Sequence, residues 1–391
     1  MFKIIFLLTP LYVTLFWSIL LNGVVEINTN PKRFLGLFMI VSFVVYLSHF
    51  LYFSPLPEIY IKIDALYQYA SLLVYPLYFI YFRLLTVDQK FSLKKHGWYL
   101  FVPTLILILY FIGIIITPSV DYKTWVFDKN MSSNVIGIKY LNVINQIIKI
   151  VFILQVICTL TGNFYLIHKY RYKAEKYYSD IQDSKINKIL ILNVTLVITA
   201  ISSISLSAIG KNFFLDDLTG LMIASVIFSS MLFIIGWLGF RQKSINPAFE
   251  VETEERLISE EELPASNRQL LLEKIICLFK DDKIYLNNKL TIQDIAQTVG
   301  TNRTYVSSII NQQFHQNFCT FVNNYRIEEL ERIVYENSEY SSQILAESSG
   351  FGSVDSLKRA IHAKNKCSFS EWKKAQIKIV KGKKGDDITL R

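Results

Sequence analysis

Long apolar stretches fill the chain up to residue 240, and the sequence beyond them returns to a mixed polar pattern with helical periodicity. A helix needs about 20 apolar residues to cross the roughly 30 Å hydrocarbon core of a bilayer. Seven stretches approach that length, at residues 4–25, 34–53, 65–85, 98–117, 144–166, 189–209 and 218–240. The first is long and six more follow it, so we read it as a retained span rather than a signal peptide. The pattern predicts an all-α chain: a polytopic transmembrane helical bundle followed by a second, water-exposed helical domain.

Basic residues are distributed unevenly between the loops that join these stretches. With the N-terminus outside, the inner loops carry twelve Lys and Arg residues and the outer loops carry five. Short cytoplasmic loops of membrane proteins are enriched in Lys and Arg, so this bias predicts that the inner loops face the cytoplasm. An odd number of spans then places the C-terminal region in the cytoplasm as well.

No predicted span carries an Asp, Glu, Lys or Arg near its centre. Ionisable residues at such positions are typical of ion-coupled transporters, so the bundle is predicted to be a sensor or an anchor. Uncharged polar residues in spans usually form hydrogen bonds between helices, although any one of them could instead line a ligand path. These residues are His49, Gln68, Gln146, Gln155, Asn163 and Asn193.

The chain changes character after the last apolar stretch. Seven glutamates lie between residues 250 and 262, a composition typical of a solvated connector. We therefore divide the chain into a transmembrane domain of about seven spans (1–243), an acidic linker (244–267), a second helical domain (268–378) and a basic tail (379–391).

Two segments of the second domain share the pattern that a helix-turn-helix requires. Such a unit needs a small residue where the helices cross, a glycine that can adopt positive φ, and an apolar residue of the second helix to close the core. The residues at these positions are Ala296, Gly300 and Val306 in the first segment and Ala346, Gly350 and Leu357 in the second. A generic helical hairpin is the alternative, but it does not require this combined spacing. The last residue of the second set comes one position later, so we expect a longer turn there.

Further landmarks accompany the two units. They are Ile295-Ala296, Phe318, Tyr325-Arg326-Ile327, Phe351, Ser353, Arg359-Ala360 and Ser370-Glu371-Trp372-Lys373. With them, residues 271–375 resemble the DNA-binding domain of AraC/XylS-type transcription regulators. The departures are His315 and Lys366 for usual glycines, Leu330 for alanine, Leu357 and Ile361 for phenylalanines, and Phe369 for proline. The resemblance implies a double helix-turn-helix domain whose units read adjacent major grooves, about 34 Å apart.

The third predicted span carries a further signature. The run from Tyr75-Pro76 to Tyr81-Phe82-Arg83, the later Lys94-Lys95-His96 and Pro103 resemble the membrane half of tethered AraC-type regulators of bacteria. Pro76 can kink the helix, and Tyr78 and Tyr81 suit an aromatic belt at the membrane interface. A packed aromatic face is the alternative.

Charge differs between the two helix-turn-helix units. Residues 263–352 carry a net charge of −2, whereas residues 353–391 carry +7, so the phosphate-seeking surface belongs mainly to the second unit and the tail. One possibility is that the first unit contacts bases through the uncharged side chains of Thr304, Ser307 and Ser308, near Arg303. The alternative is that only the second unit binds DNA firmly. By family position, the resemblance implies that Asp355, Lys358 and Arg359 face bases or phosphates.

The remaining composition offers no catalytic centre. With 52% hydrophobic residues and a mean hydropathy of +0.32, the chain needs lipid, and its four cysteines and five histidines lack metal-ligand spacing. We therefore predict no enzyme activity and no cofactor.

The function expected from the sequence is that of a membrane-tethered, sequence-specific transcription regulator that couples a membrane or extracellular cue to gene expression. The expected partners are double-stranded DNA, the lipid bilayer and an unknown ligand or membrane partner, with a homodimer left open. The expected location is the bacterial inner (cytoplasmic) membrane, with the C-terminal domain in the cytoplasm. A transporter or membrane enzyme with an accessory DNA-binding tail is the alternative, and a passive tether is a third.

Overall fold

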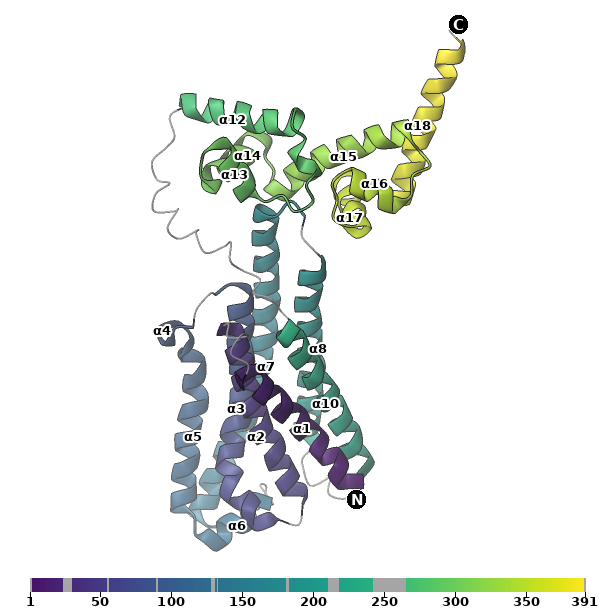
Figure 1. Cartoon of the computed structure of the whole chain (residues 1–391). Coiled ribbons are helices and arrows are strands. Elements are labelled where there is room, and N and C mark those ends of the chain that lie inside the picture. The colour runs from purple at the N-terminus through teal and green to yellow at the C-terminus, as the bar shows by residue number, and fades with distance from the viewer. Residues whose placement is uncertain are drawn as a thin grey trace. The chain divides into compact units, whose positions relative to one another are not determined.

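Helices make up the regular structure of the chain. The computed structural model describes residues 2–23, 30–54, 56–88, 91–127, 131, 133–180, 183–209, 218–241 and 265–389 (Figure 1). Over these residues it contains no β-strand, and the pairing of Tyr178 with Thr291 is an isolated bridge. The chain divides into a membrane unit, Met1–His168 with Lys188–Pro247, and a C-terminal unit, Lys169–Asn187 with Ala248–Arg391. The predicted transmembrane domain, 1–243, includes Lys169–Asn187 as an inner loop, whereas in the structure these residues group with the C-terminal unit.

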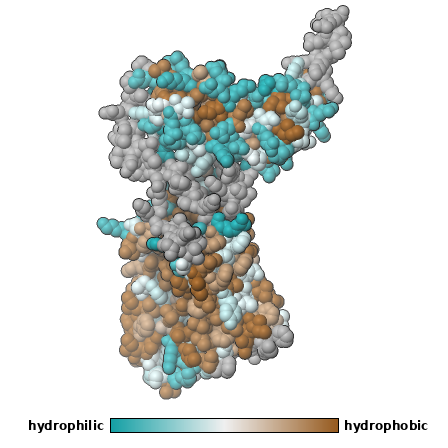
Figure 2. Space-filling view, viewed as in Figure 1, coloured by the Kyte–Doolittle hydropathy of each residue, from teal (hydrophilic) through white to brown (hydrophobic). Residues whose placement is uncertain are grey.

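Within the described residues, seven helices are long and apolar enough to cross a membrane, as predicted. They are α1 (Phe2–Gly23), α2 (Asn30–Phe53), α3 (Pro57–Thr86), α5 (Trp98–Ile116), α7 (Ile136–Tyr177), α8 (Asp183–Ile209) and α10 (Leu218–Arg241). The short helices α4 (Leu93–His96) and α6 (Ser119–Phe127) lie between them in sequence. Apolar residues dominate the visible face of the membrane unit (Figure 2). Since such a surface requires lipid, the chain is a multi-pass membrane protein.

Helix α3 is the most buried of the candidate spans. It continues through Pro76, and it packs against α2 and α5. The prediction of an interface belt is wrong for Tyr78 and Tyr81, because both side chains are buried inside the bundle. The Tyr78 hydroxyl donates to the backbone oxygen of Leu192 at 2.9 Å, and its ring meets Phe38 edge-on. The alternative, a packed aromatic face, describes this helix.

Ionisable residues do occur within the spanning helices, although not at their centres. Asp64 in α3 is fully buried and accepts hydrogen bonds from the hydroxyls of Tyr60 (3.0 Å), Tyr122 (3.3 Å) and Tyr110. Lys149 lies in the first half of α7. These tyrosine hydroxyls partly replace the hydrogen bonds with water that the Asp64 carboxylate loses on burial.

A charged cluster follows the end of α3. Arg83 Nε donates to Asp88 Oδ2 at 2.7 Å, His96 Nε2 lies 3.1 Å from the same oxygen, and Lys95 pairs with Oδ1. Burial alone would raise the pKa of Asp88, but the hydrogen bonds from these three residues lower it to about 2. The basic residues that resembled a family signature thus converge on one carboxylate.

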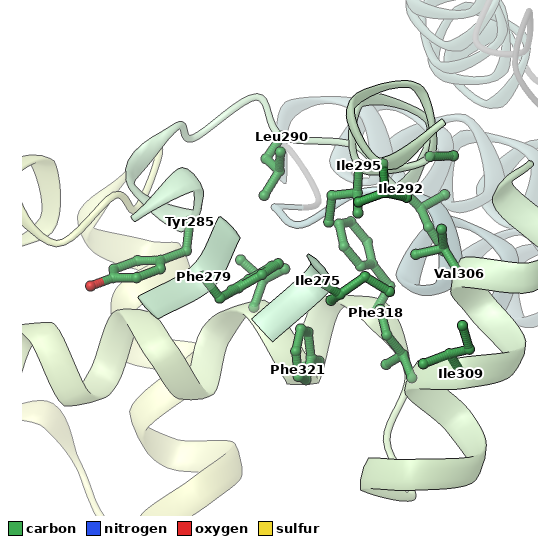
Figure 3. Close-up of a cluster of buried hydrophobic side chains, with 14 of the residues drawn as sticks. Ile275, Phe279, Tyr285, Leu290, Ile292, Ile295, Val306, Ile309, Phe318 and Phe321 are labelled. Carbon is green, nitrogen blue, oxygen red and sulfur yellow. The ribbon is translucent and has the colours of Figure 1, made fainter. Parts of the chain in front are cut away.

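The C-terminal unit contains two hydrophobic clusters joined by one long helix. Its helices are α12 (Ala265–Lys280), the 3-10 turn η2 (Ile284–Leu286), α13 (Ile292–Val299), α14 (Arg303–Phe314), α15 (Phe318–Glu336), α16 (Ser342–Ser348), α17 (Val354–Asn365) and α18 (Phe369–Thr389). The first cluster, shown in Figure 3, combines α12, α13, α14 and the start of α15. The second combines the rest of α15 with α16, α17 and α18. Helix α15 therefore connects two small cores.

Local sequence fixes where these helices begin. The Thr291 side chain accepts the N–H of Asp294 at 3.2 Å, and Asp294 Oδ2 accepts the N–H of Thr291 at 2.7 Å. Such a capping box satisfies donors that the first helical turn leaves unpaired. Side-chain caps also start α14, α15, α16 and α17, at Asn302, Asn317, Ser341 and Ser353.

Two predicted segments fall partly or wholly outside the described residues. The acidic linker 244–267 is described only from Ala265, where α12 begins. The basic tail 379–391 continues α18 as far as Thr389, and its side chains are described only at residue 379.

Candidate nucleic-acid interface

The helices α13 and α14 meet at a glycine turn. Gly300 has φ 74°, in the left-handed region that favours glycine, and its N–H donates to the Gln297 oxygen at 3.3 Å. The next N–H, of Thr301, donates to the Ala296 oxygen at 2.9 Å. Ala296 and Val306 are fully buried, so they form the contact between the two helices.

The helices α16 and α17 repeat this turn. Gly350 has φ 83°, its N–H donates to the Glu347 oxygen at 3.1 Å, and the Phe351 N–H donates to the Ala346 oxygen at 2.9 Å. Ala346 and Leu357 are fully buried. Both the hydrogen-bond offsets and the positive φ angle match those of the first turn.

The two turns differ in length. Helix α14 begins three residues after Gly300, whereas α17 begins four residues after Gly350. The later position of Leu357 relative to its glycine follows from this extra residue, as its offset in the sequence predicts. The second turn also approaches another backbone closely, since a Cβ at Gly350 would lie 2.6 Å from the Tyr285 oxygen.

The residues proposed to face DNA lie on α14 and α17. In α17 the side chains of Asp355, Lys358 and Arg359 are exposed, and the first two form a loose pair at 3.8 Å. Thr304, Ser307 and Ser308 of α14 are half-buried, and Arg303 is only 7% exposed. We call these seven residues the candidate DNA face. Its α17 part presents the more accessible charge.

A segment far away in sequence contacts this region of the C-terminal unit. Ser179 donates its backbone N–H to the Leu290 oxygen at 3.0 Å, just before α13. Asp180 Oδ2 accepts the Gly352 N–H at 2.8 Å and the Ser356 hydroxyl at 3.0 Å, at the start of α17. This contact was not predictable from the sequence, because nothing in the pattern of the α7–α8 loop indicates a partner about 170 residues further along the chain.

Arg326 of α15 holds these elements together. Its side chain is fully buried and donates to the backbone oxygens of Tyr285 (2.8 Å) and Asn287 (2.9 Å). It also donates to the oxygen (3.2 Å) and the hydroxyl (3.0 Å) of Ser179. Burial lowers the pKa of Arg326 to about 10, and the Asp180 carboxylate acts in the opposite direction. The guanidinium remains charged at neutral pH.

The arginines of the candidate face also meet the same segment. The Arg303 guanidinium lies over the Tyr177 ring, 6.0 Å from its centroid. Desolvation lowers the pKa of Arg359, whereas the Asp180 carboxylate raises it, which places this carboxylate within electrostatic reach of Arg359. Residues 177–180 therefore touch or influence both helices of the face.

Two departures from the family pattern fall at left-handed positions. His315 ends α14 with φ 53°, and Lys366 ends α17 with φ 56°. The chain keeps the glycine-like backbone path with residues that have a Cβ, which costs free energy at each position.

Comparison with known proteins adds no family. No family model, curated protein or solved structure matches this chain. Its function is therefore inferred from its own residues and their geometry.

Proposed function

We propose that this protein is a membrane-tethered transcription regulator that binds specific double-stranded DNA sites through two helix-turn-helix units, α13–α14 and α16–α17. The membrane unit anchors the regulator in the bacterial inner membrane, and the C-terminal unit faces the cytoplasm. In this proposal the chain is not an enzyme, and a membrane or extracellular cue changes its DNA binding.

The repeated turn is the observation that carries the proposal. Gly300 and Gly350 share positive φ angles and hydrogen-bond offsets, and each turn sets a capped helix against a shorter one. A helix-turn-helix places its second helix in the major groove. Two such units on the single rigid helix α15 suit two successive grooves on one side of a duplex.

Charge supports the same assignment. The second unit and the tail carry a net charge of +7, and Lys358 and Arg359 lie exposed near the start of α17. Lysine and arginine bind phosphate oxygens, and arginine also pairs with guanine edges. The difference in net charge between the two units is explained if the second unit binds mainly phosphates and the first unit reads bases.

Asp64 and Lys149 favour the alternative of a transporter, because ionisable residues within spans are typical of ion-coupled carriers. Three tyrosine hydroxyls hydrogen-bond to Asp64, however, and such bonds favour a structural role for this carboxylate.

Duplex binding by the full chain tests the proposal. The protein, in lipid nanodiscs, is titrated with a fluorescent 40-bp duplex of mixed sequence over a series of salt concentrations. We expect binding whose logarithm falls linearly with the logarithm of salt concentration, because phosphate contacts release counterions. A chain that binds no duplex at low salt, or binds it without salt dependence, contradicts the proposed function.

A further inference from the structure

The segment Tyr177–Asp180 is built into the C-terminal unit by backbone as well as side-chain bonds. Ser179 is fully buried, its N–H donates to Leu290, and both of its oxygens accept from Arg326. Tyr178 forms a bridge with Thr291, the residue that caps α13. These bonds hold the segment against the entrance to the first helix-turn-helix unit.

Asp180 extends from this segment to the N-terminus of α17. One carboxylate oxygen accepts two hydrogen bonds there, from the Gly352 N–H and the Ser356 hydroxyl. Gly352 leaves room for it, since a Cβ at that position would lie 2.7 Å from the same oxygen. A helix N-terminus with free N–H groups attracts anions, and DNA phosphates bind proteins in this way.

Tyr177 and Asp180 also engage the arginines of the candidate DNA face. The Tyr177 ring lies beside Arg303 of α14, and the Asp180 carboxylate acts on Arg359 of α17. The same four residues therefore contact α14 and the start of α17.

We propose that Tyr177–Asp180 is an internal latch: it binds the N-terminal end of α17 and contacts Arg303 of α14, and the Asp180 carboxylate stands in for a backbone phosphate at the start of α17. This inference rests on the DNA-binding function proposed above. In the latched state the protein binds DNA weakly, and release of the segment frees the N-terminal end of α17 for a DNA phosphate.

The position of the latch in the chain couples it to the membrane helices. The segment joins α7 to α8, and both are candidate membrane spans. A change in the packing of these two helices pulls directly on the residues between them. Because apparent affinity scales with the fraction of molecules in the competent state, a cue acting on the bundle changes DNA binding without touching the DNA face.

A charge-matched pair of variants tests the latch in the full chain in nanodiscs, with the 40-bp duplex as probe. Asp180→Ala removes the carboxylate at α17, and we expect it to tighten duplex binding by at least about tenfold. Glu175→Ala removes one negative charge two residues before the segment, where Glu175 pairs with Arg171 within α7. We expect the control to stay within about twofold of the unaltered protein.

A reversible crosslink provides the second arm. Cysteines are introduced by Asp180→Cys and Ser356→Cys after Ser replaces the four native cysteines, at two positions whose native Oδ2 and Oγ atoms lie 3.0 Å apart, and loss of free thiol on oxidation verifies the disulfide. We expect the oxidised protein to bind the duplex at least about tenfold more weakly than the same protein after reduction. Ser356→Cys alone should not respond to oxidant.

The outcomes separate the latch from the proposed function. Equal affinity of the Asp180→Ala and Glu175→Ala variants, or of the oxidised and reduced pair, overturns the latch while DNA binding stands. Absence of duplex binding from every variant, including the reduced pair, overturns the DNA-binding function itself.

An independent observation concerns the membrane unit. A cavity of about 420 Å³ lies among α2, α3, α7, α8 and α10. Its wall combines aromatic rings with polar groups such as His49, Gln68 and Asn145, and it includes Lys149. Among the described residues that line it there is no Asp or Glu, and no acidic side chain of the described chain forms a salt bridge with Lys149.

We propose that this cavity binds an amphipathic carboxylate, such as a fatty acid, with its head group at Lys149. An unneutralised lysine within a bundle favours an anionic ligand, and the aromatic wall suits an apolar tail. The cavity reaches Tyr52 and Ile209, at the ends of α2 and α8 that face outward in the predicted topology. The ligand would therefore enter from the outer leaflet.

Native mass spectrometry of the full chain released from detergent tests this site, with dodecanoate and uncharged dodecanol as probes. We expect dodecanoate to bind, and Lys149→Met to weaken it by at least about tenfold while leaving dodecanol unchanged. Lys139→Met, an exposed site on the same helix, is the control and should have no effect. Dodecanoate binding that survives Lys149→Met, or no dodecanoate binding at all, overturns the proposal.

Discussion

The two turn glycines, Gly300 and Gly350, differ in one respect that predicts unequal cost for the same substitution. Both have positive φ, so alanine at either position pays about 1 to 2 kcal/mol for the left-handed backbone. A Cβ at Gly300 meets nothing within 4 Å. At Gly350 it would lie 2.6 Å from the Tyr285 oxygen and 2.7 Å from the Leu286 Cα, both backbone atoms that cannot rotate away. Such overpacking adds about 1 to 3 kcal/mol.

We therefore expect Gly300→Ala to lower the free energy of unfolding by about 1 to 2 kcal/mol, and Gly350→Ala by about 2 to 5 kcal/mol. The assay is urea unfolding of the fragment 265–391, which should fold without lipid because its apolar residues are periodic; it lacks residues 169–187 of the same unit in both variants, so their loss does not bias the comparison. A single cooperative transition licenses the comparison. Equal losses, or a larger loss at Gly300, would refute the close approach of the second turn to residues 285–286.

Three further predictions concern the same unit. Arg359→Ala should weaken duplex binding by about 1 to 3 kcal/mol, whereas Thr304→Ala with Ser307→Ala should change sequence preference and leave the salt slope nearly intact, both measured by fluorescence anisotropy. Lys366→Gly should raise stability in urea by about 0.5 to 1 kcal/mol, because φ 56° strains a residue with a Cβ. Hydrogen bonds from Arg332 lower the pKa of Glu329 below its ordinary 4.5. The stability that ionised Glu329 contributes is therefore complete above pH 4.5 and is lost as the pH falls through the lowered pKa. Acid titrations of stability should therefore be flatter for Glu329→Gln, and an unchanged slope would contradict the pairing.

Much of the fold follows from local sequence. Seven apolar stretches predicted seven spanning helices, and the described part of the chain contains seven helices long and apolar enough to span a membrane. Helix α7, with 42 residues, runs well beyond its apolar core, because a helix continues into polar sequence until something ends it. The residue patterns around Gly300 and Gly350 predicted turns with positive φ, which both glycines adopt. These features are predictable because they depend on residues a few positions apart.

Contacts between distant residues were not predictable in this way. Asp180 and Ser356 are 176 positions apart, and Asp64 and Tyr110 are 46 apart. In the sequence, Asp180 looks like any solvated loop residue, and Asp64 and Tyr110 look like ordinary residues of predicted spans or their ends. The sequence left the burial of Tyr78 as the alternative to an interface position, since a tyrosine near a span end suits the interface and the bundle interior equally well.

If the proposed function holds, this membrane protein binds discrete DNA sites in its cell. The most direct measurement crosslinks DNA to the full chain in growing cells, isolates the membrane fraction, and sequences the DNA that is recovered with the protein. We expect enrichment at a limited set of sites that is lost or reduced in the Arg359→Ala variant. Recovery of no DNA above background from the membrane fraction, with the protein present and folded, would contradict it.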